Sequence, residues 1–189
     1  MDYLAKANEW KSCKLLSKEE VEQLNNMSEQ EIAEAFYTNL TFGTGGMRGI
    51  MGMGPNRMNV VTISKATLGF ARYLLNNEEN AKERGVVIAT DNRINNTKFM
   101  MAAANILTTL GIKVYIFDAL RPTPELSFAV RYLNACGGIN ITASHNPKIY
   151  NGYKIYNSEG NQLILKQSNI VMDEISKIEN ELAIEVNPN

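Results

Sequence analysis

The spacing of apolar residues predicts alternating helices and strands after a helical start. Helical spacing marks residues 1–40, 62–77, 97–110, 125–133 and 165–182. Short apolar runs, typical of strands buried on both faces, lie at 86–90, 112–117 and 136–142. A further strand is expected at 152–156, antiparallel to its neighbour because the connection is too short for a crossover. This order predicts an α/β fold, a three-layer α/β/α sandwich around a mainly parallel, mixed sheet.

The first 40 residues are predicted to form a helical extension. Ser17–Glu20 and Ser28–Glu31 both have the S-x-x-E form of a capping box, in which a hydroxyl and a carboxylate each accept a hydrogen bond from a backbone N–H. We expect residues 1–40 to pack on a main domain, residues 41–189, that ends in a linking helix. A docking arm for another chain is the alternative.

Composition excludes several function classes. The chain has 189 residues, 44% hydrophobic and 21% charged, with a formal net charge of −1. Nucleic-acid or membrane-surface binding needs a concentrated basic surface, so we expect neither partner. No apolar run is long enough to span a membrane, and no signal peptide is recognisable. The distant Cys13 and Cys136 indicate reduced thiols, so the protein is expected to be cytoplasmic.

Six glycines interrupt the periodic pattern between residues 42 and 57. A dinucleotide fingerprint is excluded, because Arg48 stands where the third glycine of G-x-G-x-x-G would be, counted from Gly43. The glycines allow close approach of the backbone to an anion, and the Arg48 guanidinium suits phosphate. The spacing alone is equally compatible with a flexible hairpin that carries a solvated arginine.

The segment Thr142–Pro147, T-A-S-H-N-P, follows a predicted buried strand. Pro147 prevents a helix from starting at once, so Ser144 is expected on a tight loop beside His145, the only histidine. Ligands collect where the strands of such a sheet end. The same edge should also carry Asp91 to Arg93, which follow another predicted strand.

Three segments resemble the α-D-phosphohexomutases, the phosphoglucomutase and phosphomannomutase superfamily. T-A-S-H-N-P followed by N-G-Y-K (151–154) resembles the family's phosphoserine loop. Residues 42–49 resemble its G-T-x-G-x-R-G signature, and residues 121–131 its P-T-P segment. The bacterial α-phosphoglucomutase branch, which also has a helical extension before the first signature, is the nearest. The resemblance implies the N-terminal phosphoserine domain of such an enzyme.

The resemblance also implies roles for individual residues. Ser144 would carry the phosphate, and His145 would contact phosphate or substrate. Lys154 would bind the reacting hydroxyl, or accept its proton if burial near Arg48 lowers the pKa of Lys154. With Arg48, these are the expected catalytic residues. The expected phosphate- and substrate-binding residues are Thr44, Gly45, Arg48, Asn146 and Asn151. Arg93, Arg121 and Arg131 are equally compatible with ion pairs at the surface.

The implied activity is an intramolecular phosphotransfer that interconverts a sugar 1-phosphate and 6-phosphate, preferentially of glucose. Glucose 1,6-bisphosphate would be intermediate and activator, and Mg²⁺ would be held partly by the phosphate on Ser144. Relatives supply three further ligands from a D-G-D-G-D-R loop in a second domain, whereas this chain contains no D-x-D. The missing domains II–IV are therefore expected partners, and the isolated piece is expected to be inactive.

Other readings remain open. A phosphomannomutase or phosphopentomutase domain would carry the same loop, because relatives distinguish sugars chiefly through later domains. A free-standing phosphate-binding module would have kept the loop without the chemistry.

Overall fold

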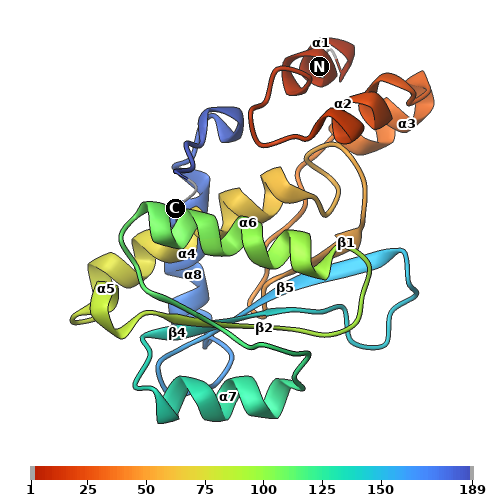
Figure 1. Ribbon diagram of the computed structural model, residues 1–189. Coiled ribbons are helices and arrows are strands. Elements are labelled where there is room, and N and C mark those ends of the chain that lie inside the picture. Colours follow the sequence, from red (N-terminus) through yellow and green to blue (C-terminus); the bar gives the residue numbers. More distant parts are fainter. Residues whose placement is uncertain (1–2, 188–189) are drawn as a thin grey trace.

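A five-stranded sheet forms the middle layer of the computed structural model, which describes residues 3–187 (Figure 1). The strand order is β1-β5-β4-β2-β3. The strands are β1 (Met47–Ile50), β2 (Val86–Thr90), β3 (Val114–Ile116), β4 (Gly137–Ile141) and β5 (Tyr150–Tyr156). β2 pairs in parallel with β3 and β4, whereas β5 is antiparallel to both β4 and β1. The predicted mixed, mainly parallel sheet is therefore confirmed.

Helices cover both faces of this sheet, as Figure 1 shows. The helices are α1 (Tyr3–Trp10), α2 (Lys18–Asn25), α3 (Glu29–Phe36), α4 (Val60–Asn77), α5 (Ala81–Arg84), α6 (Asn96–Thr109), α7 (Thr123–Tyr132) and α8 (Leu165–Ser176), with a 3₁₀ turn at Glu181–Ala183. α4 packs against α6 and α8 on one face, and α7 packs on β2 and β4 from the other. Among the described residues, no helix combines the length and apolar character that crossing a membrane requires.

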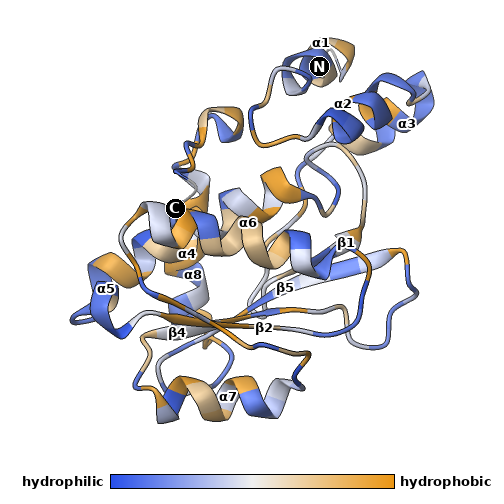
Figure 2. Cartoon of the chain, viewed as in Figure 1, coloured by the Kyte–Doolittle hydropathy of each residue, from blue (hydrophilic) through white to orange (hydrophobic). Residues whose placement is uncertain are grey.

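The two central strands, β2 and β4, are buried along their whole length. Successive side chains of a strand point to opposite faces. Val87 accordingly packs against Leu126 and Val130 of α7, whereas Ile88 joins the cluster that contains Phe70 of α4. Figure 2 shows apolar residues concentrated on these strands and more polar ones on α2 and α3. The continuous β-branched run that predicted β2 thus reflects burial on both sides.

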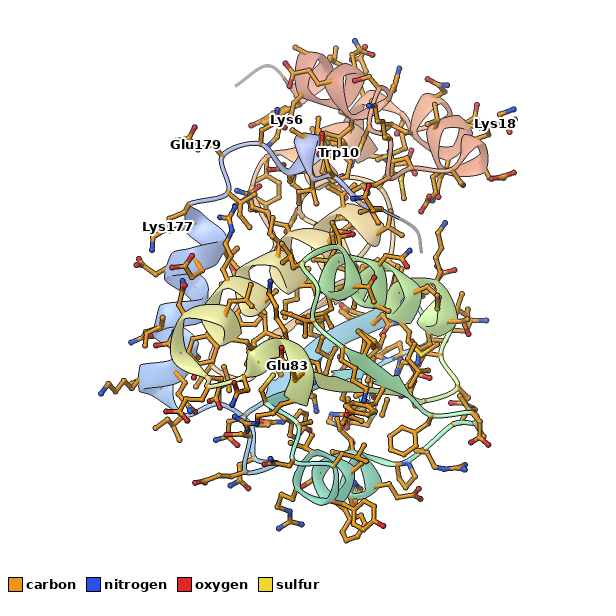
Figure 3. All side chains as sticks on the ribbon, turned by 60° about the vertical axis from the view of Figure 1, so that its left-hand side comes forward. Lys6, Trp10, Lys18, Glu83, Lys177 and Glu179 are labelled. Atoms are coloured by element: carbon orange, nitrogen blue, oxygen red, sulfur yellow. The ribbon has the colours of Figure 1, made fainter. Side chains whose placement is uncertain are left out.

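The helical extension shares an apolar cluster with the sheet domain. The indole of Trp10 meets the ring of Phe36 edge to face, with centroids 5.4 Å apart, and both belong to the cluster that contains Phe70. In Figure 3, Trp10 lies among other side chains while Lys18 projects from the surface. Both predicted capping boxes, Ser17 with Glu20 and Ser28 with Glu31, are formed.

The structure adds one strand that was not predicted and corrects the end of one predicted helix. The glycine-rich segment contains the strand β1, which glycine content and a length of four residues concealed. The predicted helix 165–182 ends at Ser176, whose hydroxyl donates to the carbonyl of Asp173, and Asn180 caps a separate 3₁₀ turn instead. Ile178 still packs in an apolar cluster, so the apolar spacing continued beyond the helix. The expectation of free thiols is confirmed, since Cys13 and Cys136 are both buried and free.

Candidate active site

The candidate site lies where β4 ends and the chain turns back into β5. Arg48 of β1 is opposite Gly152 in the register, and Lys154 of β5 is opposite Asn140 of β4. Residues two apart on a strand share a face, so Arg48 and Lys154 project to the same side of the sheet. Asn140 marks this as the side of α7, because its amide donates to Thr123 Oγ1 at the start of that helix (2.7 Å).

The loop that follows β4 exposes Ser144. The backbone of Ser144 has φ = 55°, a left-handed conformation that residues other than glycine seldom adopt. The N–H of Thr142 bonds the carbonyl of Gly152 at 3.0 Å, which joins the start of the loop to β5. The exposed His145 follows, with Nδ1 3.4 Å from Ser144 Oγ. The loop thus presents a hydroxyl and an imidazole side by side.

Arg93 is bound beneath this loop with only 11% of its side chain exposed. Its guanidinium donates four hydrogen bonds to backbone carbonyl oxygens of the loop and the start of β5. The acceptors and distances are Ser144 (2.6 Å), Asn146 (2.8 Å), Pro147 (3.2 Å) and Tyr150 (3.0 Å). Arg93 is therefore not simply part of an ion pair at the surface, because it also binds the backbone of the Ser144 loop. Arg121, by contrast, pairs with Asp118 and Glu125.

Asp91, at the end of β2, ties Arg93 to the loop. Its Oδ2 accepts the hydroxyl of Thr142 at 2.6 Å and lies 3.5 Å from Arg93 Nε. Its Oδ1 accepts from the backbone N–H of Arg93 (3.1 Å) and from the amide of Asn96 (2.5 Å). Thr142 Oγ1 in turn accepts the N–H of Ser144 at 3.0 Å. The expected meeting of Asp91, Arg93 and Ser144 at one edge of the sheet is confirmed.

Arg48 reaches the loop from β1 and donates from Nη1 to Asn146 Oδ1 at 2.6 Å. The hairpin before β1 is closed by two hydrogen bonds between Gly43 and Gly46, which leaves Thr44 and Gly45 exposed at its tip. Two of the expected site residues, Arg48 and Asn146, are therefore in direct contact. The expected phosphate ligands Thr44 and Gly45 are accessible, and the structure shows no hydrogen bond from them to the loop of Ser144.

Lys154 and Asn151 differ in their surroundings. Burial, and to a smaller extent the charge of Arg48, lower the pKa of Lys154 below the ordinary lysine value. Asn151 is fully buried: its amide donates to Asn96 Oδ1 (2.6 Å) and Ile94 O (3.1 Å), and its oxygen accepts from the N–H of Gly152. Lys154 thus lies in a partly desolvated position near Arg48, whereas Asn151 fixes β5 beside the loop.

The described residues do not by themselves fit a magnesium site. Within residues 3–187, no group of three or more histidine, cysteine, aspartate or glutamate side chains is arranged to hold a metal ion. Asp91, beside the loop, already accepts hydrogen bonds at both carboxylate oxygens. A magnesium ion requires several oxygen ligands, and the side chains around Ser144 are mainly cations and amides.

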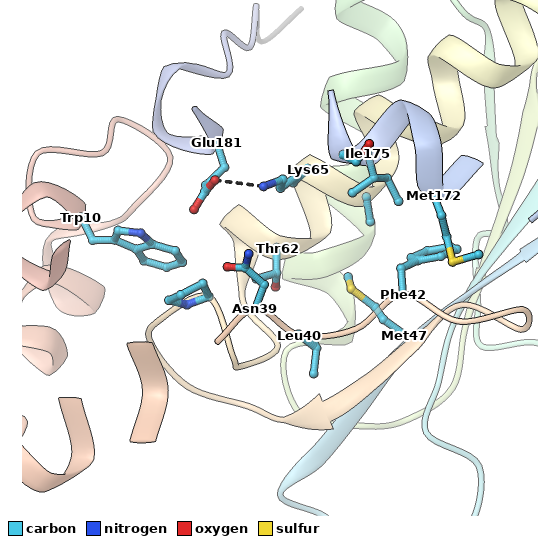
Figure 4. Close-up of a pocket in the computed structure, with 13 residues that line it drawn as sticks. Trp10, Asn39, Leu40, Phe42, Met47, Thr62, Lys65, Met172, Ile175 and Glu181 are labelled. Atoms are coloured by element: carbon cyan, nitrogen blue, oxygen red, sulfur yellow. Dashed lines mark hydrogen bonds and ion pairs between the residues drawn. The ribbon is translucent and has the colours of Figure 1, made fainter. Parts of the chain in front are cut away.

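A separate cavity of about 400 Å³ lies away from this loop (Figure 4). It is lined by Trp10, by Phe42 and Met47 on either side of the glycine hairpin, and by residues of α4 and α8. Lys65 and Glu181 form an ion pair of 3.0 Å at its wall. None of its lining residues belongs to the loop of Ser144, so it is not part of the candidate site.

Sequence reasoning missed the role of Arg93 and the link through Thr142. Both residues were placed at this edge, but nothing in the spacing showed that one arginine bonds four carbonyl groups. The sequence feature that could have indicated this role is the pattern D-x-R at Asp91 to Arg93, directly after a buried strand. Here the arginine three residues beyond the end of β2 bonds backbone groups of the neighbouring loop.

Comparisons with known proteins agree with this architecture. A phosphoglucomutase from Staphylococcus epidermidis is 47% identical over 160 residues, which is 85% of this chain and 29% of that protein. One from Staphylococcus aureus is 46% identical over 159 residues, 84% of this chain and 28% of that protein. The crystal structure of a putative phosphomannomutase from Thermus thermophilus superposes with a TM-score of 0.65 at 31% identity, covering 73% of this chain and 30% of that one.

The chain therefore spans less than a third of the length of the curated relatives it matches. Residues 39–182 match the family described as phosphoglucomutase/phosphomannomutase, alpha/beta/alpha domain I. This chain belongs to the phosphoglucomutase/phosphomannomutase family, of which it carries domain I.

Proposed function

We propose that this chain is the phosphoserine-bearing domain of a hexose-phosphate mutase. The enzyme would interconvert a sugar 1-phosphate and a 6-phosphate through a bisphosphate intermediate. The observation that carries this proposal is the exposed Ser144 on its constrained loop, with His145 next to it and Arg48 bonded to the loop through Asn146. Glucose is the favoured sugar, because the relatives with 46–47% identity are named phosphoglucomutases.

In the proposed step, a free hydroxyl of the sugar phosphate attacks the phosphorus carried by Ser144. The new O–P bond forms as the bond to Ser144 Oγ breaks, and the sugar becomes a bisphosphate. Phosphoryl transfer depends mostly on positioning and on stabilising the charge of the transferred oxygens. Arg48 supplies a fixed positive charge for this purpose, and glucose 1,6-bisphosphate would return a phosphoryl group to a bare serine.

Lys154 is the proposed acceptor for the proton of the attacking hydroxyl. Its lowered pKa increases the fraction of neutral amine, and proton transfer is most effective when that pKa approaches the working pH. His145 is proposed to contact the phosphate, because Nδ1 lies 3.4 Å from Ser144 Oγ. Thr44, Gly45 and Asn146 are proposed to line the phosphate and substrate site, and Asn151 to support it from within the core.

The complete reaction is proposed to need more of the polypeptide than this chain. The family implies Mg²⁺, whose chemistry is to neutralise phosphate charge, and the phosphate on Ser144 would be one ligand. We place its other ligands in segments corresponding to the remaining length of the relatives. The chain by itself is accordingly expected to be inactive or nearly so.

Intact-mass spectrometry with peptide mapping tests the role of Ser144. In the full-length enzyme proposed to contain this chain, incubated with Mg²⁺ and glucose 1,6-bisphosphate, we expect a gain of about 80 Da, one phosphoryl group, on the peptide that contains Ser144. The Ser144→Ala variant should show no gain, whereas Ser158→Ala, in another loop, should behave as wild type. Slower transfer from mannose 1,6-bisphosphate would support glucose. The same gain on another residue, with Ser144 bare, would contradict the mechanism.

A further inference from the structure

One arginine binds three carbonyl groups of the Ser144 loop and a fourth at the start of β5. Four backbone oxygens, from Ser144 to Tyr150, accept hydrogen bonds from Arg93 at 2.6 to 3.2 Å. A guanidinium has five N–H groups in a rigid plane, so it can hold several acceptors at once, which a lysine ammonium cannot do with the same geometry. The largely buried Arg93 therefore fixes the shape of the loop.

Asp91 and Thr142 hold the other side of Ser144. The Thr142 hydroxyl donates to Asp91 Oδ2 at 2.6 Å, so its hydrogen is committed and a lone pair is left for the N–H of Ser144, 3.0 Å away. Asp91 also lies 3.5 Å from Arg93 Nε and accepts the backbone N–H of that residue. The carboxylate thus connects the arginine to the threonine.

This network surrounds a strained residue. Ser144 has φ = 55°, and a left-handed backbone is unfavourable for a residue with a Cβ. Such a conformation persists only where the surroundings impose it. Bonds to both the N–H and the carbonyl of Ser144 supply that constraint.

The network also decides which backbone groups a phosphate would meet. The carbonyl oxygens of Ser144, Asn146 and Pro147 are all directed to Arg93. Among the described residues, the N–H of His145 has no acceptor, whereas the N–H of Asn146 bonds Ala143 O at 3.1 Å. Free N–H groups attract phosphate oxygens and carbonyl oxygens repel them, so the loop offers an anion a donor.

We propose that Arg93, Asp91 and Thr142 act as a positioning unit for the proposed phosphoserine. The unit holds Ser144 in its left-handed conformation, withdraws the carbonyl oxygens from the phosphate, and leaves the N–H of His145 free to bind it. This inference rests on the proposed function of Ser144. None of the three residues touches the reacting atoms, so their effect is conformational.

Residue-resolved amide hydrogen exchange on the 189-residue chain tests the unit without any phosphorylation. In Arg93→Lys and in Thr142→Val, exchange at Ser144, Asn146 and Tyr150 should rise about ten-fold or more, because a lost charge-assisted or buried hydrogen bond favours local opening. Thr142→Ser, which keeps the hydroxyl, should remain near wild type. Amides of Ile88 and Ile139 in the central strands should not change. Unaltered loop exchange, or an equal rise throughout the sheet, would overturn the proposal.

A thermodynamic cycle tests the strain itself. Glycine adopts φ = 55° without strain and alanine only at a cost, so Ser144→Gly should have an unfolding constant about five-fold smaller than Ser144→Ala. In the Arg93→Lys background this difference should disappear, since the loop is then free to relax. Equal constants in the otherwise wild-type chain, or the same difference in both backgrounds, would refute the role of Arg93.

Titration with inorganic phosphate tests the free donor. The amide signal of His145 should shift in wild type and shift less in Thr142→Val, in which the loop is released. A shift that is confined to Arg48 and Lys154 would refute the donor role of His145. If Ser144 fails to accept phosphate while loop exchange responds as expected, the proposed function fails, and only the fixing of the loop conformation by Arg93, Asp91 and Thr142 stands.

Discussion

At the scale of single residues, the site is defined by the charges around Ser144. Arg48 reaches the loop across β5, and Lys154 lies on the same face of the sheet. The partial burial of Lys154 and the nearby charge of Arg48 both disfavour the protonated form of Lys154. The same cations attract the phosphate that we propose on Ser144, so the site is electropositive before it is loaded.

The pKa of Lys154 should respond to Arg48. We expect Lys154 to titrate below 10.5, and Arg48→Gln to raise its pKa only in part, because burial is the larger cause. The unfolded chain binds this proton more tightly, so the group's contribution to the unfolding free energy rises with pH between the lowered pKa and 10.5. NMR titration of the side-chain amine checks the pKa, and urea unfolding against pH checks the slope.

The control for this prediction is Arg57→Gln. Arg57 pairs with Glu34 and belongs to the connection between β1 and α4, so its loss should leave the titration of Lys154 unchanged. A Lys154 that titrates at or above 10.5 in wild type would contradict the expectation, as would an Arg48→Gln variant without any shift.

At the scale of elements, the glycine hairpin sets how closely β1 approaches β5. Gly46 has φ = 115°, and a Cβ on it would lie 1.9 Å from the carbonyl oxygen of Tyr153. Gly152 is similarly confined, since its Cβ would lie 2.5 Å from the carbonyl oxygen of Thr142. Both contacts are with backbone atoms, which cannot rotate away. The two glycines therefore allow Arg48 and Ser144 to be brought to one site.

Gly46→Ala should destabilise the protein much more than Gly45→Ala. We expect a loss of about 3 kcal/mol or more at Gly46, because strain and a backbone clash combine there. At Gly45 a Cβ would make an ordinary contact of 3.5 Å with Gln162, so the change should stay within about 0.5 kcal/mol. Urea unfolding of both variants measures the difference. Similar losses would show that the hairpin is not held against β5 as described.

At the scale of the whole molecule, the extension and the sheet domain share a core. Trp10, 1% exposed, and Phe36 belong to one apolar cluster with residues of α4, β4 and β5. A shared core couples the stability of its parts, so the extension and the domain should unfold together. The shared cluster also connects α1 to the proposed site. Phe42 and Met47 belong to it, and Met47 directly precedes Arg48 in β1.

Trp10→Ala should therefore lower the stability of the entire chain. Removing a buried tryptophan costs about 3–5 kcal/mol, and one cooperative transition should remain. Circular dichroism during urea unfolding measures both. As control, Tyr132→Ala removes a side chain that is 76% exposed on α7 and should cost less than about 1 kcal/mol. A sheet domain that keeps wild-type stability in Trp10→Ala would show that the extension is independent.

Much of the fold follows from patterns within short stretches of sequence. The capping boxes at Ser17 and Ser28 act across three residues, and the buried run 86–90 is recognisable as a strand wherever it folds. The length of α8 was not predictable in this way. Apolar spacing continued past Ser176 because the following segment is also packed, although it is not helical.

The sequence by itself determined the layers of the fold, the family and Ser144 as the candidate phosphate carrier, because periodicity, caps and motifs are local properties. Tertiary structure decided that Arg93 bonds the loop of Ser144 and that Arg48 meets Asn146, 98 residues away. Tertiary structure also determined that residues 47–50 form the strand β1 and that the backbone of Ser144 is left-handed. The reason is physical: these features depend on partners that are distant in the chain, and only folding brings those partners within hydrogen-bonding distance.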